Sequence, residues 1–141
     1  MQRFTPRVRV QMLLIGMVTL CSVATAESPH NNYVIHCQGC HLADGSGHPP
    51  DVPSFTGQLG DFLRVEGGRA YLVQVPGTAN APLDDRSVAE LLNWMLERFS
   101  DRMRPANFAP YSAQEVAGYR REKLADPAAR RKSLLAALPD A

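Results

Sequence analysis

Five consecutive residues carry the densest chemistry of the sequence. Cys37, Gln38, Gly39, Cys40 and His41 place two thiols three positions apart, with an imidazole directly after the second thiol. This C-x-x-C-H pattern is typical of covalent c-type haem attachment. Each thiol can add to one vinyl group of the porphyrin, and the adjacent imidazole can then lie under the iron. The pattern therefore predicts a covalent and coordinating clamp.

Other uses of closely spaced cysteines fit the sequence less well. A structural zinc site needs four ligands, and the sequence has no second C-x-x-C or H-x-H pair. A thioredoxin-like redox pair occurs in a βαβ context, and the sequence has no strand-like alternation long enough to build a sheet. Chance occurrence is the third alternative, but the motif follows a segment typical of export.

That export segment occupies residues 1–26. Arg3, Arg7 and Arg9 precede an apolar run over residues 10–23, and Ala24-Thr25-Ala26 supplies small residues for cleavage. The run has fourteen residues, whereas a membrane span needs about 20. The pattern predicts a signal peptide cleaved after Ala26, export to the periplasm and no stable membrane insertion. An uncleaved anchor helix is the alternative.

Length, charge and cysteine count exclude several classes of protein. The chain has 141 residues, a formal net charge of +1 and three cysteines. This length fits one small domain, the charge is too near neutral for an obvious nucleic-acid binder, and the cysteines are too few for a disulfide-dense scaffold. Removing residues 1–26 takes away three arginines and Cys21, which leaves twelve basic against fourteen acidic residues. The two cysteines that remain are the number that one c-type haem requires.

The residues around the motif resemble the class I cytochromes c over about residues 29–99. Tyr33 is similar to the family's aromatic residue on its N-terminal helix, and Gly45 and Gly47 are similar to its loop at the haem edge. Pro53 is similar to the proline whose carbonyl accepts the second N–H of the proximal histidine, a contact that fixes the ring. The resemblance implies an all-α fold of three to five helices wrapped around one covalently bound haem.

The clearest periodic segment predicts a helix over residues 87–99. Its apolar residues recur at the spacing of one helical face, and Ser87 with Glu90 forms a predicted capping box at its start. The segment resembles the family's terminal helix, which crosses the N-terminal helix near Tyr33. Trp94 is interpreted as a packing residue at that crossing. The apolar face comprises Val88, Leu91, Leu92, Met95, Leu96 and Phe99.

A middle helix is expected to begin at Gly67 and Gly68 and to end at Pro76. The paired glycines resemble the tight start of the family's middle helix. The sequence favours neither of two interpretations of Arg69. The first is that it pairs with a haem propionate, and the second is that it is a solvated charge at the start of the helix.

The sixth ligand of the iron does not follow the family pattern. Typical bacterial members carry a methionine between the middle and terminal helices, and residues 78–83 contain none. Met103, which follows the periodic helix, is the best single candidate, while Met95 is expected in the core. An open iron position is a further alternative. The weaker candidates are His30, His36 and His48.

The remainder of the chain is predicted to be a helical extension that is atypical for the family. Helices are expected over residues 112–124 and 128–138, the second with Asp126 as N-cap and Pro127 at its first position. The predicted division is a signal peptide (1–26), a cytochrome c domain (27–100) and an extension packed on or beside it (101–141). Its basic residues form either a solvated face or a docking patch for an acidic redox partner; they are Arg120, Arg121, Arg130, Arg131 and Lys132.

These features predict a periplasmic monohaem electron carrier. By analogy with the family, the donor is a periplasmic dehydrogenase and the acceptor is an oxidase or a larger cytochrome. The sequence has no catalytic constellation, so the protein is not expected to be an enzyme unless the sixth iron position is open. An open position predicts a five-coordinate protein that binds a small gaseous ligand or peroxide. A haem subunit of a dehydrogenase complex is the third hypothesis.

Overall fold

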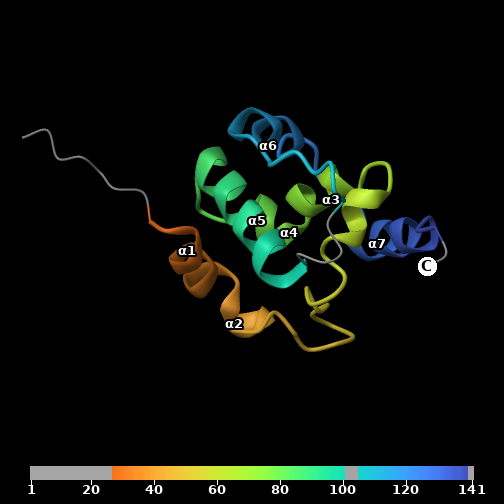
Figure 1. Ribbon diagram of the computed structural model, residues 1–141, viewed down its shortest axis with the longest axis horizontal. Helices are drawn as coiled ribbons and strands as arrows, with labels where there is room; N and C mark the ends of the chain where they lie inside the picture. Colours follow the sequence, from red (N-terminus) through yellow and green to blue (C-terminus); the bar gives the residue numbers. More distant parts are fainter. Residues whose placement is uncertain (1–26, 101–104, 140–141) are drawn as a thin grey trace, which may run out of the picture.

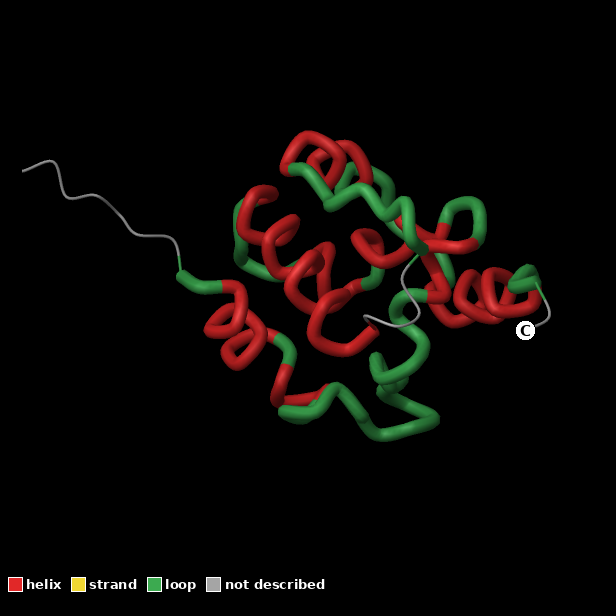
Figure 2. Tube along the Cα trace, viewed as in Figure 1, coloured by secondary structure: helices red, strands yellow, loops and turns green. Residues whose placement is uncertain are grey.

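The computed structural model describes residues 27–100 and 105–139, and every regular element in these two ranges is helical (Figure 2). In chain order the elements are α1 (Pro29–His36), α2 (Gln38–His41), the 3-10 helix η1 (Asp61–Arg64), α3 (Gly68–Gln74), α4 (Pro76–Ala79), α5 (Asp85–Ser100), α6 (Ala113–Tyr119) and α7 (Pro127–Ala136). The predicted all-α class is therefore confirmed, but the described residues form seven α-helices and one 3-10 helix rather than three to five, because short helical turns such as α2 and α4 add to the longer helices. None of these described helices is long and apolar enough to cross a bilayer. The predicted signal peptide and Met103 lie outside the described residues.

The longest helix, α5, lies at the centre of the fold, with α1 packed on one side and α6 on another (Figure 1). Every member of its predicted apolar face is buried, including Met95, which is 5% exposed. Burial of each such side chain contributes about 1.5–3 kcal/mol. Trp94 packs on Tyr33 at the crossing of α1 and α5, with ring centroids 5.4 Å apart. The predictions for the apolar face and for Trp94 are confirmed.

The start of α5 differs from the predicted capping box. The helix begins at Asp85, two residues before Ser87. The carboxylate of Asp84 accepts a hydrogen bond from the backbone N–H of Ser87 at 2.7 Å, so Asp84 is the N-cap. Glu90 pairs with Arg86 at 2.9 Å instead. The prediction failed because Asp and Ser are both good caps and stand three residues apart.

The middle helix α3 begins at Gly68, as predicted, and the reason is a close backbone approach. A Cβ atom at Gly68 would overlap the carbonyl of Phe62 in η1, so only glycine lets the two segments touch. The helix ends before Val75, which is extended. Pro76 then starts a further helical turn, α4, because proline suits the first position of a helix.

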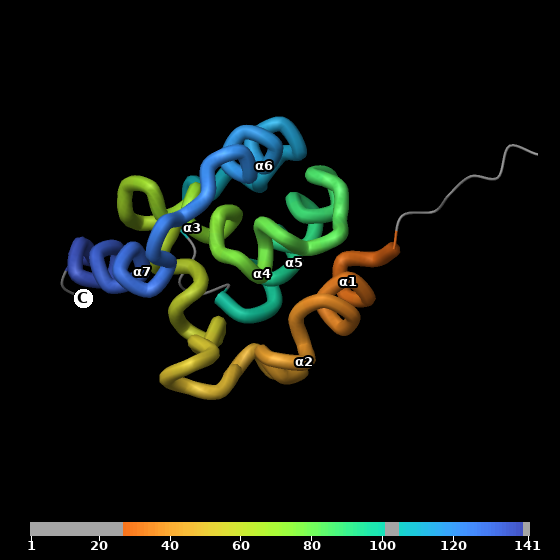
Figure 3. Tube along the Cα trace, turned by 180° about the vertical axis from the view of Figure 1, so that it is seen from behind, coloured from red at the N-terminus to blue at the C-terminus, as the bar shows by residue number. Residues whose placement is uncertain are grey.

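Residues 105–139 form the C-terminal segment, which packs back onto the preceding helices (Figure 3). Helix α6 lies against α5, and α7 lies against α3. Both helices are capped at their starts. Ser112 accepts from the N–H of Glu115 at 3.2 Å, and Asp126, the predicted cap, accepts from that of Ala129 at 2.9 Å. The first of these helices is shorter than expected, because α6 ends at Tyr119.

Candidate functional site

The two cysteines and the histidine lie on a single turn where α1 meets α2. Cys37 ends α1 and precedes α2 with a φ of −126°. The backbone N–H groups of Cys40 and His41 both donate to the Cys37 carbonyl, at 3.1 and 2.9 Å. Cys37 is partly buried, Cys40 is exposed, and neither forms a disulfide. The fold thus brings the three predicted residues together within one turn of backbone.

The His41 ring is held from one face by an aromatic side chain. Phe55 stacks on it with ring centroids 3.8 Å apart and planes 18° apart. Burial lowers the pKa of His41, and the nearby Pro53 carbonyl raises it by a smaller amount. The lowered pKa favours the neutral imidazole, the form that binds a metal.

One nitrogen of this ring lacks a partner. Nδ1 of His41 is buried and makes no hydrogen bond of good geometry with any described residue. The Pro53 carbonyl nevertheless lies close enough to the ring to raise the pKa of His41. The Pro53 carbonyl thus lies beside the ring, as predicted, and its contact with Nδ1 falls outside the usual limits of distance and direction for a hydrogen bond.

The thiol of Cys37 has the opposite character to a thioredoxin-like cysteine. Burial raises its pKa to about 11, and Cys40 raises it further as a smaller cause. Redox-active C-x-x-C pairs instead depend on a thiolate with a depressed pKa. The thiol–disulfide alternative therefore has no electrostatic support at Cys37.

The loop after the motif is folded tightly over the histidine. The N–H of Gly47 donates to the carbonyl of His41 at 3.2 Å, and that of Phe55 donates to the carbonyl of Gly45 at 2.7 Å. Gly47 has a φ of +64°, and a Cβ atom there would meet the carbonyl of Val52 at 2.5 Å. Glycine at this position is required by both the angle and the contact. The loop delivers Phe55 to the face of His41.

Tyr33 links the N-terminal helix to the backbone beside His41. Its ring is 1% exposed, and its hydroxyl donates to the carbonyl of Leu42 at 2.6 Å. Burial is the main cause that raises its pKa to about 12. The ring also contacts Phe99 of α5, with centroids 5.2 Å apart. Tyr33 thus fixes the chain immediately after the histidine to the α1–α5 crossing.

The largest exposed apolar side chains of the described residues flank the same motif. Val34 is 42% exposed, Ile35 is 63% exposed and Leu42 is 36% exposed. All three stand within three positions of the Cys37–His41 segment. A chain usually buries such residues, so their exposure leaves apolar surface beside the two thiols. This surface, the free thiols and the neutral imidazole fit an apolar, iron-bearing group attached at this turn.

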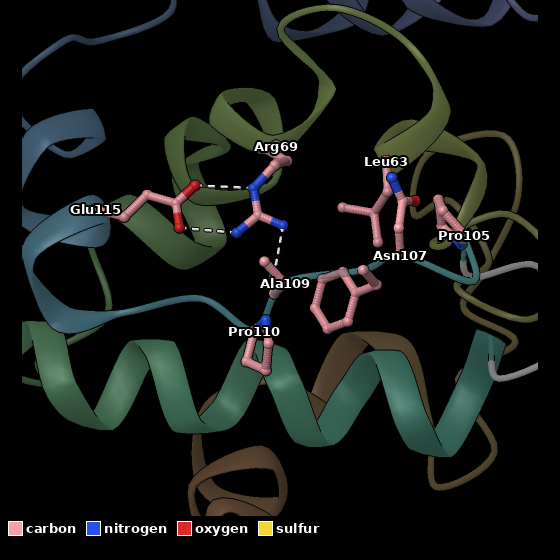
Figure 4. A pocket seen from close by; sticks show the side chains of 8 residues that line it. Leu63, Arg69, Pro105, Asn107, Ala109, Pro110 and Glu115 are labelled. Carbon is pink, nitrogen blue, oxygen red and sulfur yellow. Dashed lines mark hydrogen bonds and ion pairs between the residues drawn. The ribbon is translucent and has the colours of Figure 1, made fainter.

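Both interpretations of Arg69 are wrong. Its guanidinium makes two parallel bonds to the carboxylate of Glu115, at 2.8 and 2.7 Å, and donates to the carbonyl of Ala109 at 2.9 Å (Figure 4). It also lies 4.2 Å from the ring centroid of Tyr111. Arg69 is neither solvated at the helix start nor free for a propionate, because its partners come from the C-terminal segment.

A pocket of about 390 Å³ lies beside this ion pair (Figure 4). None of Cys37, Cys40 and His41 lines it. Its wall comprises Leu63, Arg69, Pro105, Asn107, Phe108, Ala109, Pro110 and Glu115. The Arg69–Glu115 pair forms part of that wall, so the strongest charges of the pocket already neutralise each other.

The predicted basic cluster does not form one solvated face. Arg120 donates to backbone carbonyls near α4, and its side chain is 19% exposed. Arg131 donates to Gln58 and lies over the ring of Phe62. Both alternatives, a solvated face and a docking patch, grouped five residues by their proximity in sequence, whereas Arg120 turns inward and Arg131 is partly covered. The exposed members are Arg121, Arg130 and Lys132.

The sixth-ligand candidates are scattered. Met103 lies outside the described residues, so its prediction stays a prediction. His30 packs on Trp94 with ring centroids 5.6 Å apart, and exposed His48 pairs with Val52 through the backbone. Within ranges 27–100 and 105–139, no group of three or more His, Cys, Asp or Glu side chains could hold a metal ion.

Three functional contacts were missed from the sequence. Phe55 carried a weak signal, because an aromatic residue two positions after Pro53 was available to pack on the histidine. The pairing of Glu115 with Arg69 and the inward turn of Arg120 had no local signal, since their partners are more than 30 residues away.

Comparisons with known proteins point in the same direction as the motif. No family model matches the chain. A cytochrome c-552 of Thermus thermophilus is 29% identical over 129 residues, which cover 79% of this chain and 87% of that protein. A second cytochrome c-552 of the same species is 31% identical over 106 residues, covering 62% of this chain and 81% of that protein.

Proposed function

Since the chain belongs to the class I c-type cytochromes, we propose that Cys37, Cys40 and His41 hold its haem. The protein is a monohaem electron-transfer protein with a covalently bound haem c, not an enzyme. In this proposal Cys37 and Cys40 would hold the porphyrin through thioethers, formed by addition of each thiol to a vinyl group, and His41 would bind the iron as its proximal axial ligand. Bound haem supplies an iron that alternates between ferric and ferrous states.

The single observation that carries the proposal is the shared turn. Both thiols and the imidazole belong to one backbone turn closed by hydrogen bonds to the Cys37 carbonyl. Free thiols at that spacing can reach two vinyl groups of one porphyrin. The exposed side chains of Val34, Ile35 and Leu42 supply apolar surface beside them. Burial of that surface by the haem would contribute to stability.

The chain's own contribution to electron transfer is to orient the axial imidazole. Phe55 covers one face of the His41 ring, and Tyr33 fixes the backbone that follows it. A ring held on one face and at its backbone changes little in orientation when the charge of the iron changes. Little reorganisation at the ligand favours rapid one-electron exchange.

We propose Met103 as the sixth ligand, on the grounds that residues 78–83 contain no methionine and that Met95 is in the core. The same lack of a methionine supports the second candidate function, a five-coordinate haem protein that binds a gas or peroxide. A haem subunit of a dehydrogenase complex is the remaining alternative. The five-coordinate candidate and the electron carrier differ in whether ferrous iron has an open position.

The proposed setting is the periplasm. Arginines followed by an apolar run and Ala26 favour export and cleavage of residues 1–26. The proposed donor is a periplasmic dehydrogenase, and the proposed acceptor is an oxidase or another cytochrome. We also propose that residues 27–100 form the cytochrome domain and residues 101–141 its extension.

An optical spectrum tests the ligand assignment. Methionine on ferric iron gives a weak band near the red end of the spectrum, and the reduced low-spin protein then ignores carbon monoxide. We expect the purified protein to show this band and to ignore carbon monoxide when reduced, and we expect Met103→Ala to lose both properties. Rapid binding of carbon monoxide by the unmodified protein would instead support the five-coordinate candidate. An unchanged spectrum in Met103→Ala would exclude Met103 as the ligand.

A further inference from the structure

The side chain of Arg120, just after α6, ends in the corner between α4 and α5. Its Nη1 donates to the carbonyl of Leu83 at 2.8 Å and to the carboxylate of Asp85 at 2.9 Å. Its Nη2 donates to the carbonyls of Ala81 at 2.9 Å and Ala79 at 3.1 Å. Its Nε donates to the Ala79 carbonyl at 3.2 Å. All three guanidinium nitrogens are therefore bonded.

Three backbone carbonyls and one carboxylate of the corner thus converge on one cation. The three carbonyls lie within residues 79–83, and the carboxylate belongs to the first residue of α5. We propose that this corner, residues 79–85, is a binding site for a guanidinium group, which Arg120 fills from within the same chain. The C-terminal segment is then held as a tethered ligand of the preceding helices.

The geometry selects a guanidinium rather than another cation. The acceptors surround the edge of a flat group, and five N–H donors in a fixed fork match acceptors on several sides. A lysine ammonium has three donors on one atom and cannot reach the same spread of carbonyls. The single carboxylate of Asp85 balances the single positive charge, so the filled corner is neutral.

A second ion pair also joins the C-terminal segment to the preceding helices, but here the arginine belongs to the preceding helices and the carboxylate to the C-terminal segment. Arg69 of α3 reaches Glu115 near the start of α6, while Arg120 just beyond the end of α6 reaches the corner. Helix α6 is therefore held near both ends. Arg120 also fixes the stretch over residues 78–83, in which the family resemblance places a methionine and this chain has none. We infer that the guanidinium keeps this stretch in one conformation.

The test uses the full haem-loaded chain and the variant Arg120→Ala, with Arg121→Ala as a matched control at the exposed neighbouring position. Arg120→Ala is expected to lower the melting temperature by about 5 °C or more, because several bonds to a charged group are lost. Arg121→Ala is expected to melt like the unmodified protein. Circular dichroism at the helical band measures both.

Chemical rescue distinguishes a binding site from general stabilisation. Millimolar guanidinium chloride is expected to raise the melting temperature of Arg120→Ala, while equal concentrations of sodium chloride or urea do not. The unmodified protein and Arg121→Ala are not expected to gain. A response shared by all three proteins, or an equal response to sodium chloride, would overturn the proposal.

A second variant covers the case in which Arg120→Ala does not fold. Arg120→Lys keeps the charge without the fork, and it is expected to show faster amide hydrogen exchange over residues 79–85 than the unmodified protein. Guanidinium is expected to slow that exchange towards the unmodified rate. Unchanged exchange in Arg120→Lys would show that the fork is not needed and would refute the assignment.

Discussion

Two regions of the molecule satisfy their polar groups in different ways. The attachment region comprises residues 33–56, and the anchoring region comprises residues 69–85 together with residues 109–120. The attachment region contains two free thiols, a buried His41 nitrogen without a described partner, and exposed apolar side chains. In the anchoring region, Arg69 and Arg120 each bond to a carboxylate and to backbone carbonyls.

This difference indicates which region the chain can complete by itself. Exposed apolar side chains beside two free thiols form a surface that a bound apolar group would cover. The anchoring region has no comparable deficit among the described residues. On the proposed attachment, the attachment region would depend on the haem for its stability, whereas the anchoring region would not.

Removal of the haem should have the largest effect. The double variant Cys37→Ala with Cys40→Ala is expected to lose about 4 kcal/mol of unfolding free energy or more, the contribution of a tightly held ligand. Amide hydrogen exchange is expected to accelerate in α1, α2 and the loop that ends at Phe55. Exchange in α5 and α6 should change much less. Equal acceleration in both regions would show that the two are not independent.

Disruption of the Arg69–Glu115 pair should have the next largest effect, in the other region. Arg69→Ala is expected to cost about 2 kcal/mol, because it leaves a partly buried carboxylate without its charged partner. Denaturant unfolding measures the loss. Arg86→Ala is the matched control, since that arginine forms an exposed ion pair with Glu90, and no measurable change is expected. A change in the weak absorption band of the ferric haem near the red end of the spectrum in Arg69→Ala would contradict the separation of the two regions.

Phe55→Leu should alter the haem environment more than it alters stability. The substitution keeps most of the apolar volume and is expected to cost less than about 1.5 kcal/mol. It removes the ring stacked on His41, so the ferric electron paramagnetic resonance spectrum and the midpoint potential are expected to shift. Phe99→Leu is the control, because Phe99 packs in the same cluster without stacking on the histidine. Equal shifts in the two variants would argue against a specific role for Phe55.

The smallest effect expected is a pH dependence from Glu115. Its hydrogen bonds to Arg69 are the main cause that lowers its pKa below the ordinary value of 4.5. A depressed carboxyl pKa adds stability above the unfolded value, and that stability is lost as the pH falls through the folded value. Unfolding free energy should therefore decline below about pH 4.5, and Arg69→Ala should flatten the decline. An identical pH profile in Arg69→Ala would refute this linkage.

Local patterns predicted most of the helices and the attachment motif. The apolar spacing of α5, the caps Ser112 and Asp126, and the glycine start of α3 depend on residues close together in sequence. The Cys37–His41 segment carries its chemistry in five positions, so no tertiary information was needed to interpret it. The competition between Asp84 and Ser87 as caps is a local ambiguity that the sequence leaves open.

Long-range contacts account for the errors. Arg69 finds Glu115 46 positions away, and Arg120 finds the carbonyl of Leu83 37 positions away. Nothing near either arginine in the sequence distinguishes it from a solvated charge. The stacking of Phe55 on His41 depends on the turn of the glycine loop, so the position of Phe55 after Pro53 was only a weak signal.

Covalent attachment at Cys37 and Cys40 is tested by the haem content of the purified full chain after extraction with acidified acetone, which removes haem that is not covalently bound. One haem per chain is expected to resist extraction, and that haem is expected to be lost when Cys37 and Cys40 are both replaced by alanine. Extractable haem in the unmodified protein, or retained covalent haem in the double variant, would contradict the assignment of these thiols.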